Sequence, residues 1–433
     1  MTDSRTRWAW LAGLLLSGVL GAATPTIGSA GEVLRLFGAG ASFPAPLYLR
    51  WFRDYYLAHT NVRIDYQSIG SGGGIKDMIN GRIDFAGSDL PLTIAQKARV
   101  PGGATQVPMT AGAIVLIYNL DGVDDLKLSR EAVVGILTGR IEAWNDPAIA
   151  ATNPGAALPD SPISVVARSD VSGTTFHVTR HFSAASADFA QSIGATMTPN
   201  WPKVLKERGA LIRGRGNDGV AAFVQAIPGS IGYVQYAFGH LTGMKMAALQ
   251  NRAGNIVAPN QASFHAALAG IGSDPNPNSI NDPPGDDSYP IIALSWLVLR
   301  QEYDDPAKRQ ALIDVIRYAL GPGQDMCEQL GYIRFAPTAV NYVFDLLKQP
   351  EQSEKLRRAG SPVPGGWRRP SCTQLLEGVT AKQTLHLAGW HRAMNVRTSA
   401  SGWRANGPSR ERRWQPVRQP APKRVFAPTV MAL

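Results

Sequence analysis

The sequence predicts an α/β protein whose polar turns gather at the carboxyl ends of parallel strands. A short strand, a turn of small residues and an amphipathic helix follow one another twice between residues 33 and 79. A third strand, 83–87, then ends at Ser88 and Asp89. The turns that follow parallel strands meet at one edge of the sheet, so we expect a site at that edge.

The two units differ mainly in their turns. The first has a strand at 33–37 and a glycine-rich turn at 38–46, in which Ser42 can cap the following helix. The second has a strand at 62–66 and a turn at 69–74. Their helices carry apolar stripes, formed by Leu47, Trp51, Phe52 and Tyr55 in the first unit and by Ile75, Met78 and Ile79 in the second.

The rest of the body alternates in the same way. The pattern predicts strands at 113–118, 163–167, 231–236 and 291–299, helices within 131–145, 173–182, 220–224, 306–320 and 338–348, and a surface loop at 271–288.

Composition and charge separate a body from a tail. With 433 residues, of which 44% are hydrophobic and 18% charged, the chain is long enough for two or three soluble globular domains. Residues 350–433 hold 15 Lys/Arg and 4 Asp/Glu, whereas residues 1–349 hold 28 and 29. The body is nearly neutral, so nucleic acid is not expected as its partner.

The basic tail has three open interpretations. Trp367, Trp390, Trp403 and Trp414 lie among its arginines, a combination that suits an anionic surface or nucleic acid. A disordered extension or a translated stretch beyond the true gene end also fits the composition, and we favour these two.

Residues 1–30 resemble an export signal. Arg5 and Arg7 precede an apolar core, and a small-residue cleavage site ends at Ala30. An uncleaved anchor is the alternative, although the apolar run is short for a membrane span. Export predicts an oxidising periplasmic location, in which Cys327 and Cys372 could pair, but we expect both to be free.

The stretch 167–176 suits an anion. A predicted strand, a Ser/Gly/Thr turn and a helix start place several free backbone N–H groups at one point. Ser172 and Thr174 add hydroxyl donors, and Arg168 adds a fork of N–H groups that matches a tetrahedral oxyanion. An ordinary helix cap beside a surface arginine is the alternative.

The glycine-rich turn 70–74 is not a nucleotide motif, because no Gly-Lys-Ser/Thr closes it and its glycine spacing does not fit a dinucleotide fingerprint. Asp89 is a carboxylate among groups that otherwise attract anions. It either belongs to the site or caps a helix at 90–98.

Six segments together resemble the periplasmic phosphate-binding protein of the high-affinity phosphate ABC transporter. They are residues 38–46, 66–74, 84–92, 136–153, 168–176 and 214–236. The resemblance implies an α/β, two-lobed, type II-like binding protein that closes on phosphate in a cleft between its lobes. The implied first lobe spans 31–110 and 290–349 and the second 111–289, with crossings near 108–112 and 288–291.

The resemblance also implies a ligand set. The positions that match the family's phosphate ligands are Ser42, Phe43 (through its backbone N–H), Ser71, Asp89, Arg168, Ser172, Gly173 and Thr174, and Asp170 matches the acidic residue that orients the arginine. Three positions depart from the family's pattern. Ser42 replaces the commoner threonine, Gly72 stands where serine is usual, and Val171 stands where glycine is usual and could alter the turn's backbone angles.

The implied function is capture of inorganic phosphate and its delivery to the permease and ATPase subunits of the transporter. The protein would act as a monomer, without metal, cofactor or enzymatic activity. An ionised Asp89 would accept the proton that phosphate carries and sulfate lacks. The alternative is a secreted phosphatase with a serine nucleophile, such as Ser172 with His177 as its base.

Overall fold

A long strand, β4 (Ala104–Tyr118), lies at the centre of the fold. The computed structural model describes residues 33–271 and 281–358 of the chain. One sheet of eight strands runs through them in the order β2-β1-β3-β11-β4-β8-β6-β7. β4 pairs antiparallel with β11 through residues 104–113 and with β8 through residues 114–118. The sheet therefore has two halves, which we call half A (β2, β1, β3, β11) and half B (β8, β6, β7).

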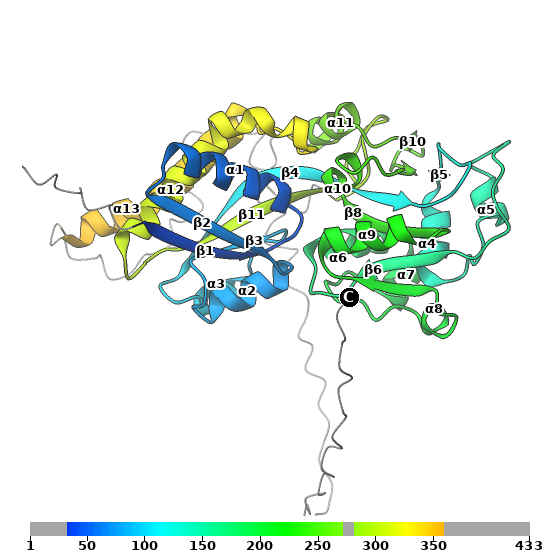
Figure 1. The fold of residues 1–433 in the computed structure, drawn as a ribbon, viewed down its shortest axis with the longest axis horizontal. Coiled ribbons are helices and arrows are strands. Elements are labelled where there is room, and N and C mark those ends of the chain that lie inside the picture. Colours follow the sequence, from blue (N-terminus) through cyan, green and yellow to red (C-terminus); the bar gives the residue numbers. More distant parts are fainter. Residues whose placement is uncertain (1–32, 272–280, 359–433) are drawn as a thin grey trace, which may run out of the picture. The chain divides into compact units, whose positions relative to one another are not determined.

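Half A combines parallel and antiparallel pairing. β1 (Leu34–Gly40) lies parallel to β2 (Val62–Ser68) and β3 (Phe85–Ser88), and β11 (Ile292–Arg300) is antiparallel to β3. Figure 1 shows this half surrounded by helices. They are α1 (Ala45–Ala58), α2 (Ser71–Ile79), α3 (Ile94–Arg99), α12 (Pro306–Leu320) and α13 (Pro337–Arg358), with short 3-10 turns η1 (Pro322–Met326) and η2 (Glu328–Leu330).

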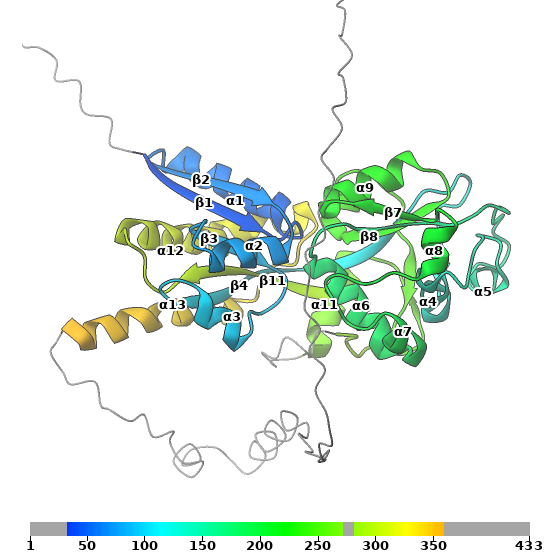
Figure 2. The ribbon, with the colours of Figure 1, turned by 90° about the horizontal axis from the view of Figure 1, so that it is seen from below.

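In half B, β6 (Ser164–Arg168) lies parallel to both β7 (Leu211–Gly214) and β8 (Ser230–Gln235). A small sheet joins β5 (Lys127–Leu128), β9 (Ala248–Gln250) and β10 (Ile256–Val257). Figure 2 shows the helices of this half beside those of half A. They are α4 (Arg130–Thr138), α5 (Pro147–Ala150), α6 (Gly173–Ala185), α7 (Ala187–Ser192), α8 (Lys203–Glu207), α9 (Gly216–Ala226), α10 (Tyr236–His240) and α11 (Gln261–Ile271).

The predicted apolar stripe of α1 lies in the core. Leu47, Trp51, Phe52 and Tyr55 are all buried. The indole of Trp51 donates a 2.8 Å hydrogen bond to the carbonyl oxygen of Gly323, so its one polar atom is satisfied where it is buried. This contact fixes α1 to the turn that follows α12.

The predicted strands and helices of the body are present, but several of their bounds and the expected Ser42 cap were wrong, and the alternative interpretation of Asp89 as a helix cap does not apply. β4 begins at Ala104 rather than residue 113, and α13 extends to Arg358 rather than ending at 348. Ser42 does not cap α1, whose N-cap position is Pro44. Asp89 caps no helix either, because α3 begins later with Thr93 in a capping box with Gln96.

Several predictions lie outside the described residues: the export signal at 1–30, Cys372, residues 272–280 of the predicted loop 271–288 and all but the first residues of the basic tail. Within the described part, no helix is long and apolar enough to cross a membrane. Cys327 is buried and free, and burial raises the pKa of its thiol to about 12.

Candidate anion-binding site

The predicted ligand positions meet where α2 and the end of β3 face the start of α6. Ser71 is the first residue of α2 and Gly173 the first of α6. A Cβ added to Gly173 would lie 2.6 Å from Cβ of Asp89 and 2.7 Å from Oγ of Ser71. Only a residue without a side chain allows half A and half B to approach this closely.

Asp89 is buried at this junction and its two carboxylate oxygens accept different hydrogen bonds. Ser71 Oγ donates to Oδ2 over 3.2 Å, and Ser295 Oγ donates to Oδ1 over 2.8 Å. Burial raises the pKa of Asp89 to about 7, although these hydroxyls and the charge of Arg168 act in the opposite direction. Near neutral pH this carboxyl group can therefore exchange a proton with a ligand.

Ser295 was not identified from the sequence as a residue of the site. It lies in β11, where Trp296 pairs with Ser88, so Ser295 stands beside Asp89 in the antiparallel register. The pairing of β11 with β4 shifts between Ser295 and Trp296, and such an irregularity re-aims a side chain. The available signal was a single serine inside the otherwise apolar run 292–299, IALSWLVL.

Arg168 and Asp170 form the second feature of the site. The Arg168 guanidinium donates from Nε to Oδ1 of Asp170 over 2.8 Å and from Nη2 to Oδ2 over 2.5 Å. The amide of Gly216 donates to Oδ1 over 3.0 Å. Burial alone would raise the pKa of Asp170, but the hydrogen bonds and charge of Arg168 hold it below its usual range. The predicted orienting role of Asp170 agrees with this paired geometry.

Ser42 and Thr174 are connected through Asn217, another residue that sequence reasoning missed. Asn217 donates to Ser42 Oγ from its backbone N over 3.1 Å and from Nδ2 over 2.8 Å. Its Nδ2 also reaches Thr174 Oγ1 at 3.5 Å, and Arg168 Nη1 donates to that oxygen over 3.3 Å. Asn217 follows the start of α9, within a segment that the family resemblance already covered.

Ser172 caps α6, as the alternative interpretation of this stretch as an ordinary helix cap predicts. Its Oγ accepts a 3.0 Å hydrogen bond from the amide of Thr175. The hydroxyl proton is still free to be donated, and the first amides of the helix, on Gly173 and Thr174, have no partner within the helix. Capping and anion binding by Ser172 are therefore compatible. Phe43 is buried nearby, and its carbonyl accepts a 2.7 Å hydrogen bond from Tyr332 Oη.

The suggested pair of Ser172 and His177 is wrong. His177 instead places Nε2 2.8 Å from the carbonyl oxygen of Asp89, and its Nδ1 lies 3.3 Å from Nη2 of Arg180. Both ring nitrogens thus have other partners. In the described residues, no group of three or more His, Cys, Asp or Glu side chains is arranged to hold a metal ion.

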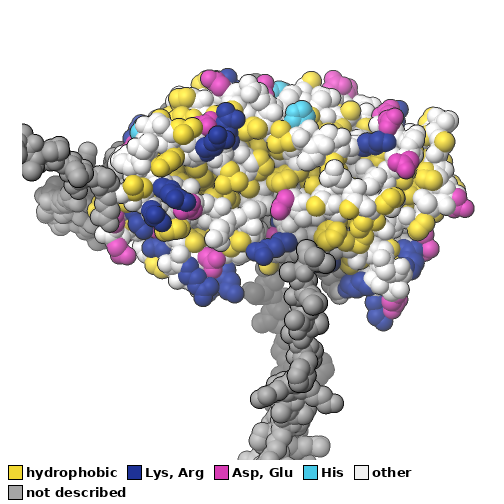
Figure 3. Space-filling model, in the orientation of Figure 1, with side chains coloured by type: hydrophobic (Ala, Val, Ile, Leu, Met, Phe, Trp, Pro, Cys, Tyr) yellow, Lys and Arg dark blue, Asp and Glu magenta, His cyan; other side chains and the backbone are white. Residues whose placement is uncertain are grey.

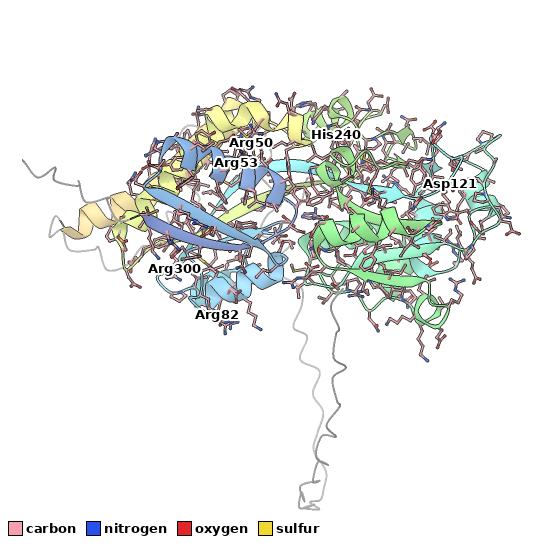
Figure 4. All side chains as sticks on the ribbon, in the orientation of Figure 1. Arg50, Arg53, Arg82, Asp121, His240 and Arg300 are labelled. Carbon is pink, nitrogen blue, oxygen red and sulfur yellow. The ribbon has the colours of Figure 1, made fainter. Side chains whose placement is uncertain are left out.

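Several other arginines of the described residues lie apart from this junction. Figure 3 shows Lys and Arg side chains in small groups interspersed with Asp and Glu on the visible face. Figure 4 places Arg50 and Arg53 on α1, and Arg82 and Arg300 in the outer part of half A, away from the start of α6. The charge of Arg168 acts on Asp89, and Asp170 is paired with Arg168.

Comparisons with known proteins agree on one family. A model of the PBP superfamily domain matches residues 22–322. A phosphate-binding protein PstS of Xylella fastidiosa (strain 9a5c) is 37% identical over 326 residues, covering 74% of this chain and 86% of the relative. The PstS of Pasteurella multocida (strain Pm70) is 38% identical over 301 residues, covering 68% of this chain and 85% of the relative.

Two solved structures share the fold. One is a high affinity periplasmic phosphate-binding protein (PfluDING) bound with phosphate, with a TM-score of 0.59, 21% identity, and coverage of 72% of this chain and 93% of the other. The second is an ancestral soluble variant of the human phosphate-binding protein, with a TM-score of 0.58, 21% identity, and coverage of 71% and 93%.

Proposed function

Since the chain belongs to the PstS family of phosphate-binding proteins within the PBP superfamily, we propose that it captures inorganic phosphate for an ABC transporter. The observation that carries the proposal is one buried acceptor, Asp89, held at the same junction as the Arg168–Asp170 pair and the start of α6. The proposed ligands are Ser42, Phe43, Ser71, Asp89, Arg168, Ser172, Gly173 and Thr174, with Asp170 behind Arg168.

Selectivity follows from the balance of donors and acceptors. Hydroxyls, helix-start amides and one guanidinium donate to the oxygens of the anion. An ionised Asp89 only accepts, so it requires a ligand with a proton. Near neutral pH phosphate carries at least one proton and sulfate carries none, so sulfate would leave two acceptors facing each other. An unsatisfied buried contact of this kind costs about 1–3 kcal/mol, and more when charges are involved.

Capture is proposed to occur by hinge closure. Ser71 and Asp89 come from half A, whereas Arg168 and Thr174 come from half B, so the complete ligand shell exists only when the halves approach. The crossings are proposed where β4 changes partner after Ala113 and where Ile291 accepts a hydrogen bond from the amide of Ile114. Phosphate shifts the equilibrium toward the closed form because it contacts both half-sites there.

Delivery completes the proposal. Residues 1–30 would direct export to the periplasm, where the monomeric, closed protein would dock on the permease and ATPase subunits of a phosphate transporter. We also propose that it has no phosphatase activity, because His177 is engaged by Asp89 and Arg180 and is not paired with Ser172.

Calorimetry with phosphate, sulfate and a phosphate monoester on one purified sample tests the function. We expect stoichiometric phosphate binding, weak or no sulfate binding, and no release of product from the ester. Catalytic turnover of the ester, or absence of phosphate binding, would contradict the proposal.

A further inference from the structure

His177 connects the two halves of the site, and it is not among the predicted ligand positions. It lies on α6 four residues after Gly173, so the two residues share one face of the helix. Gly173 approaches the side chain of Asp89, and His177 reaches its backbone, with Nε2 2.8 Å from the carbonyl oxygen. α6 therefore holds Asp89 by a hydrogen bond that crosses from half B to half A.

The surroundings of His177 determine its tautomer. Nη2 of Arg180 lies 3.3 Å from Nδ1, and a guanidinium can only donate. Nδ1 is therefore the acceptor, and the ring proton resides on Nε2, where it is donated to the carbonyl of Asp89. The charged or titratable groups that face the ring are Arg180 on the same helix and Asp89 from the loop after β3.

We propose that His177 is a positioning residue that latches the closed site, and that protonation of its ring opposes closure. The proposal rests on the proposed phosphate-binding function. A second proton would have to reside on Nδ1, where it would displace the hydrogen bond from Arg180 and face a like charge. Acid therefore opposes closure through the protein, in addition to any change in the ligand itself.

The size of the effect follows from the two environments of the ring. In the closed site, burial and then the charge of Arg180 lower the pKa of His177 to about 3, although the hydrogen bond to the Asp89 carbonyl favours the charged ring. When the halves separate, the ring loses its contact with half A but keeps Arg180 beside it on α6, so its pKa rises to at most the ordinary value of about 6.5. Because the ring must lose its proton on closure, phosphate binding at pH 5 should be weaker by up to about 30-fold than with a ring that stays neutral.

The test compares the wild type with His177→Gln from pH 8 to pH 5, using calorimetry with inorganic phosphate. The amide of Gln can donate to the Asp89 carbonyl but does not titrate. Asp89 and phosphate titrate in both proteins. The ratio of the phosphate dissociation constants of the wild type and His177→Gln therefore reports the contribution of His177 alone. We expect the wild type to weaken relative to His177→Gln by up to about 30-fold between pH 8 and pH 5.

His181→Gln is the matched control. His181 lies one turn further along α6, is also buried, and burial lowers the pKa of its ring to about 4. Its ring faces Asp282, with Nδ1 and Oδ1 3.9 Å apart, and not half A. This variant should keep the wild-type pH dependence of phosphate binding.

His177→Leu provides a second variant should His177→Gln fail to fold. Leucine neither donates to the Asp89 carbonyl nor titrates, so this variant should bind phosphate more weakly than the wild type at pH 8 and should lack the additional weakening toward pH 5. The proposed role of His177 would be disproved if the ratio of the wild-type and His177→Gln dissociation constants stayed constant from pH 8 to pH 5. It would also be disproved if His181→Gln lost the same pH dependence. Failure of the wild type to bind phosphate at pH 8 would instead overturn the proposed function.

Discussion

The amide of Gly72 donates a 3.0 Å hydrogen bond to the carbonyl oxygen of Val171, joining α2 to the turn before α6. A Cβ added to Gly72 would lie 2.2 Å from Cγ1 of Val171 and 2.5 Å from its Cβ. These are two of the positions that depart from the pattern implied by the family resemblance, with glycine at 72 in place of serine and valine at 171 in place of glycine. The side chain missing on one side makes room for the extra side chain on the other.

The turn itself does not require glycine at Val171. Among the described residues, Asp282 is the non-glycine residue with a positive φ, and Val171 is not in that region. Valine at position 171 therefore does not force the backbone of this turn into the region that favours glycine. Its consequence is packing against Gly72.

We predict that Gly72→Ser weakens phosphate binding by about 5- to 150-fold. The added side chain must displace Val171 in the closed form, and overpacking of this kind costs about 1–3 kcal/mol. Adding Val171→Gly should restore most of the affinity, so a double-mutant cycle measured by calorimetry should be strongly non-additive. Gly73→Ser is the control, because the three atoms nearest to its added Cβ all belong to Ile69 of its own half. Additive losses in the cycle would contradict a fit between the two positions.

Ser295→Ala is predicted to weaken phosphate binding by about 10- to 150-fold at pH 7. The ionised carboxylate of Asp89 loses its 2.8 Å hydrogen bond, and a bond to a charged group contributes about 1.5–3 kcal/mol. The pKa of Asp89 rises further without this donor, so selectivity for phosphate over sulfate should require a higher pH than in the wild type.

Ser230→Ala is the control for Ser295→Ala. It removes another fully buried hydroxyl, which donates to the carbonyls of Ile227 and Val224 within half B. Loss of this hydroxyl should lower the unfolding temperature, whereas the affinities for phosphate and sulfate should not change. Equal affinities for Ser295→Ala and the wild type from pH 6 to pH 9 would show that Asp89 does not depend on Ser295.

Arg168→Lys is predicted to weaken phosphate binding by about 10- to 100-fold. Lysine keeps the charge but cannot make the two-pronged contact with Asp170 while it donates to an anion. Arg130→Lys is the matched control, because Arg130 makes a similar two-bond contact with Asp282, at 2.9 and 2.5 Å. It should lower the unfolding temperature and leave phosphate affinity unchanged. Wild-type phosphate affinity in Arg168→Lys would show that Arg168 is not a phosphate ligand.

The sequence was informative where local pattern and local chemistry coincide. Apolar spacing predicted the buried stripe of α1, and a strand followed by Ser-Gly-Thr predicted the start of α6. Ser42 and Asp89 were each compatible with capping a helix. Only the three-dimensional contacts distinguish that possibility, since Asn217 engages Ser42 and Ser295 engages Asp89.

The missed residues act across long sequence separations. Ser295 lies 206 positions from Asp89, and Asn217 lies 175 positions from Ser42. Their contacts depend on strand register and on the approach of α9 to half A, neither of which leaves a local pattern in the sequence. His177 looked like a possible base because serine and histidine were close in sequence, but α6 directs it toward Asp89.

The most direct test of the account is the ratio of sulfate to phosphate dissociation constants in the wild type and Asp89→Asn, measured from pH 8.5 to pH 6. Burial raises the pKa of Asp89 to about 7. Above that pH the carboxylate only accepts and rejects sulfate, whereas below it the protonated group can donate to sulfate. The wild-type ratio should fall as the pH is lowered, and the ratio in Asp89→Asn should be at least about 100-fold smaller at pH 8.5 and nearly independent of pH. Undiminished preference for phosphate in Asp89→Asn at pH 8.5 would show that Asp89 does not select the protonated anion.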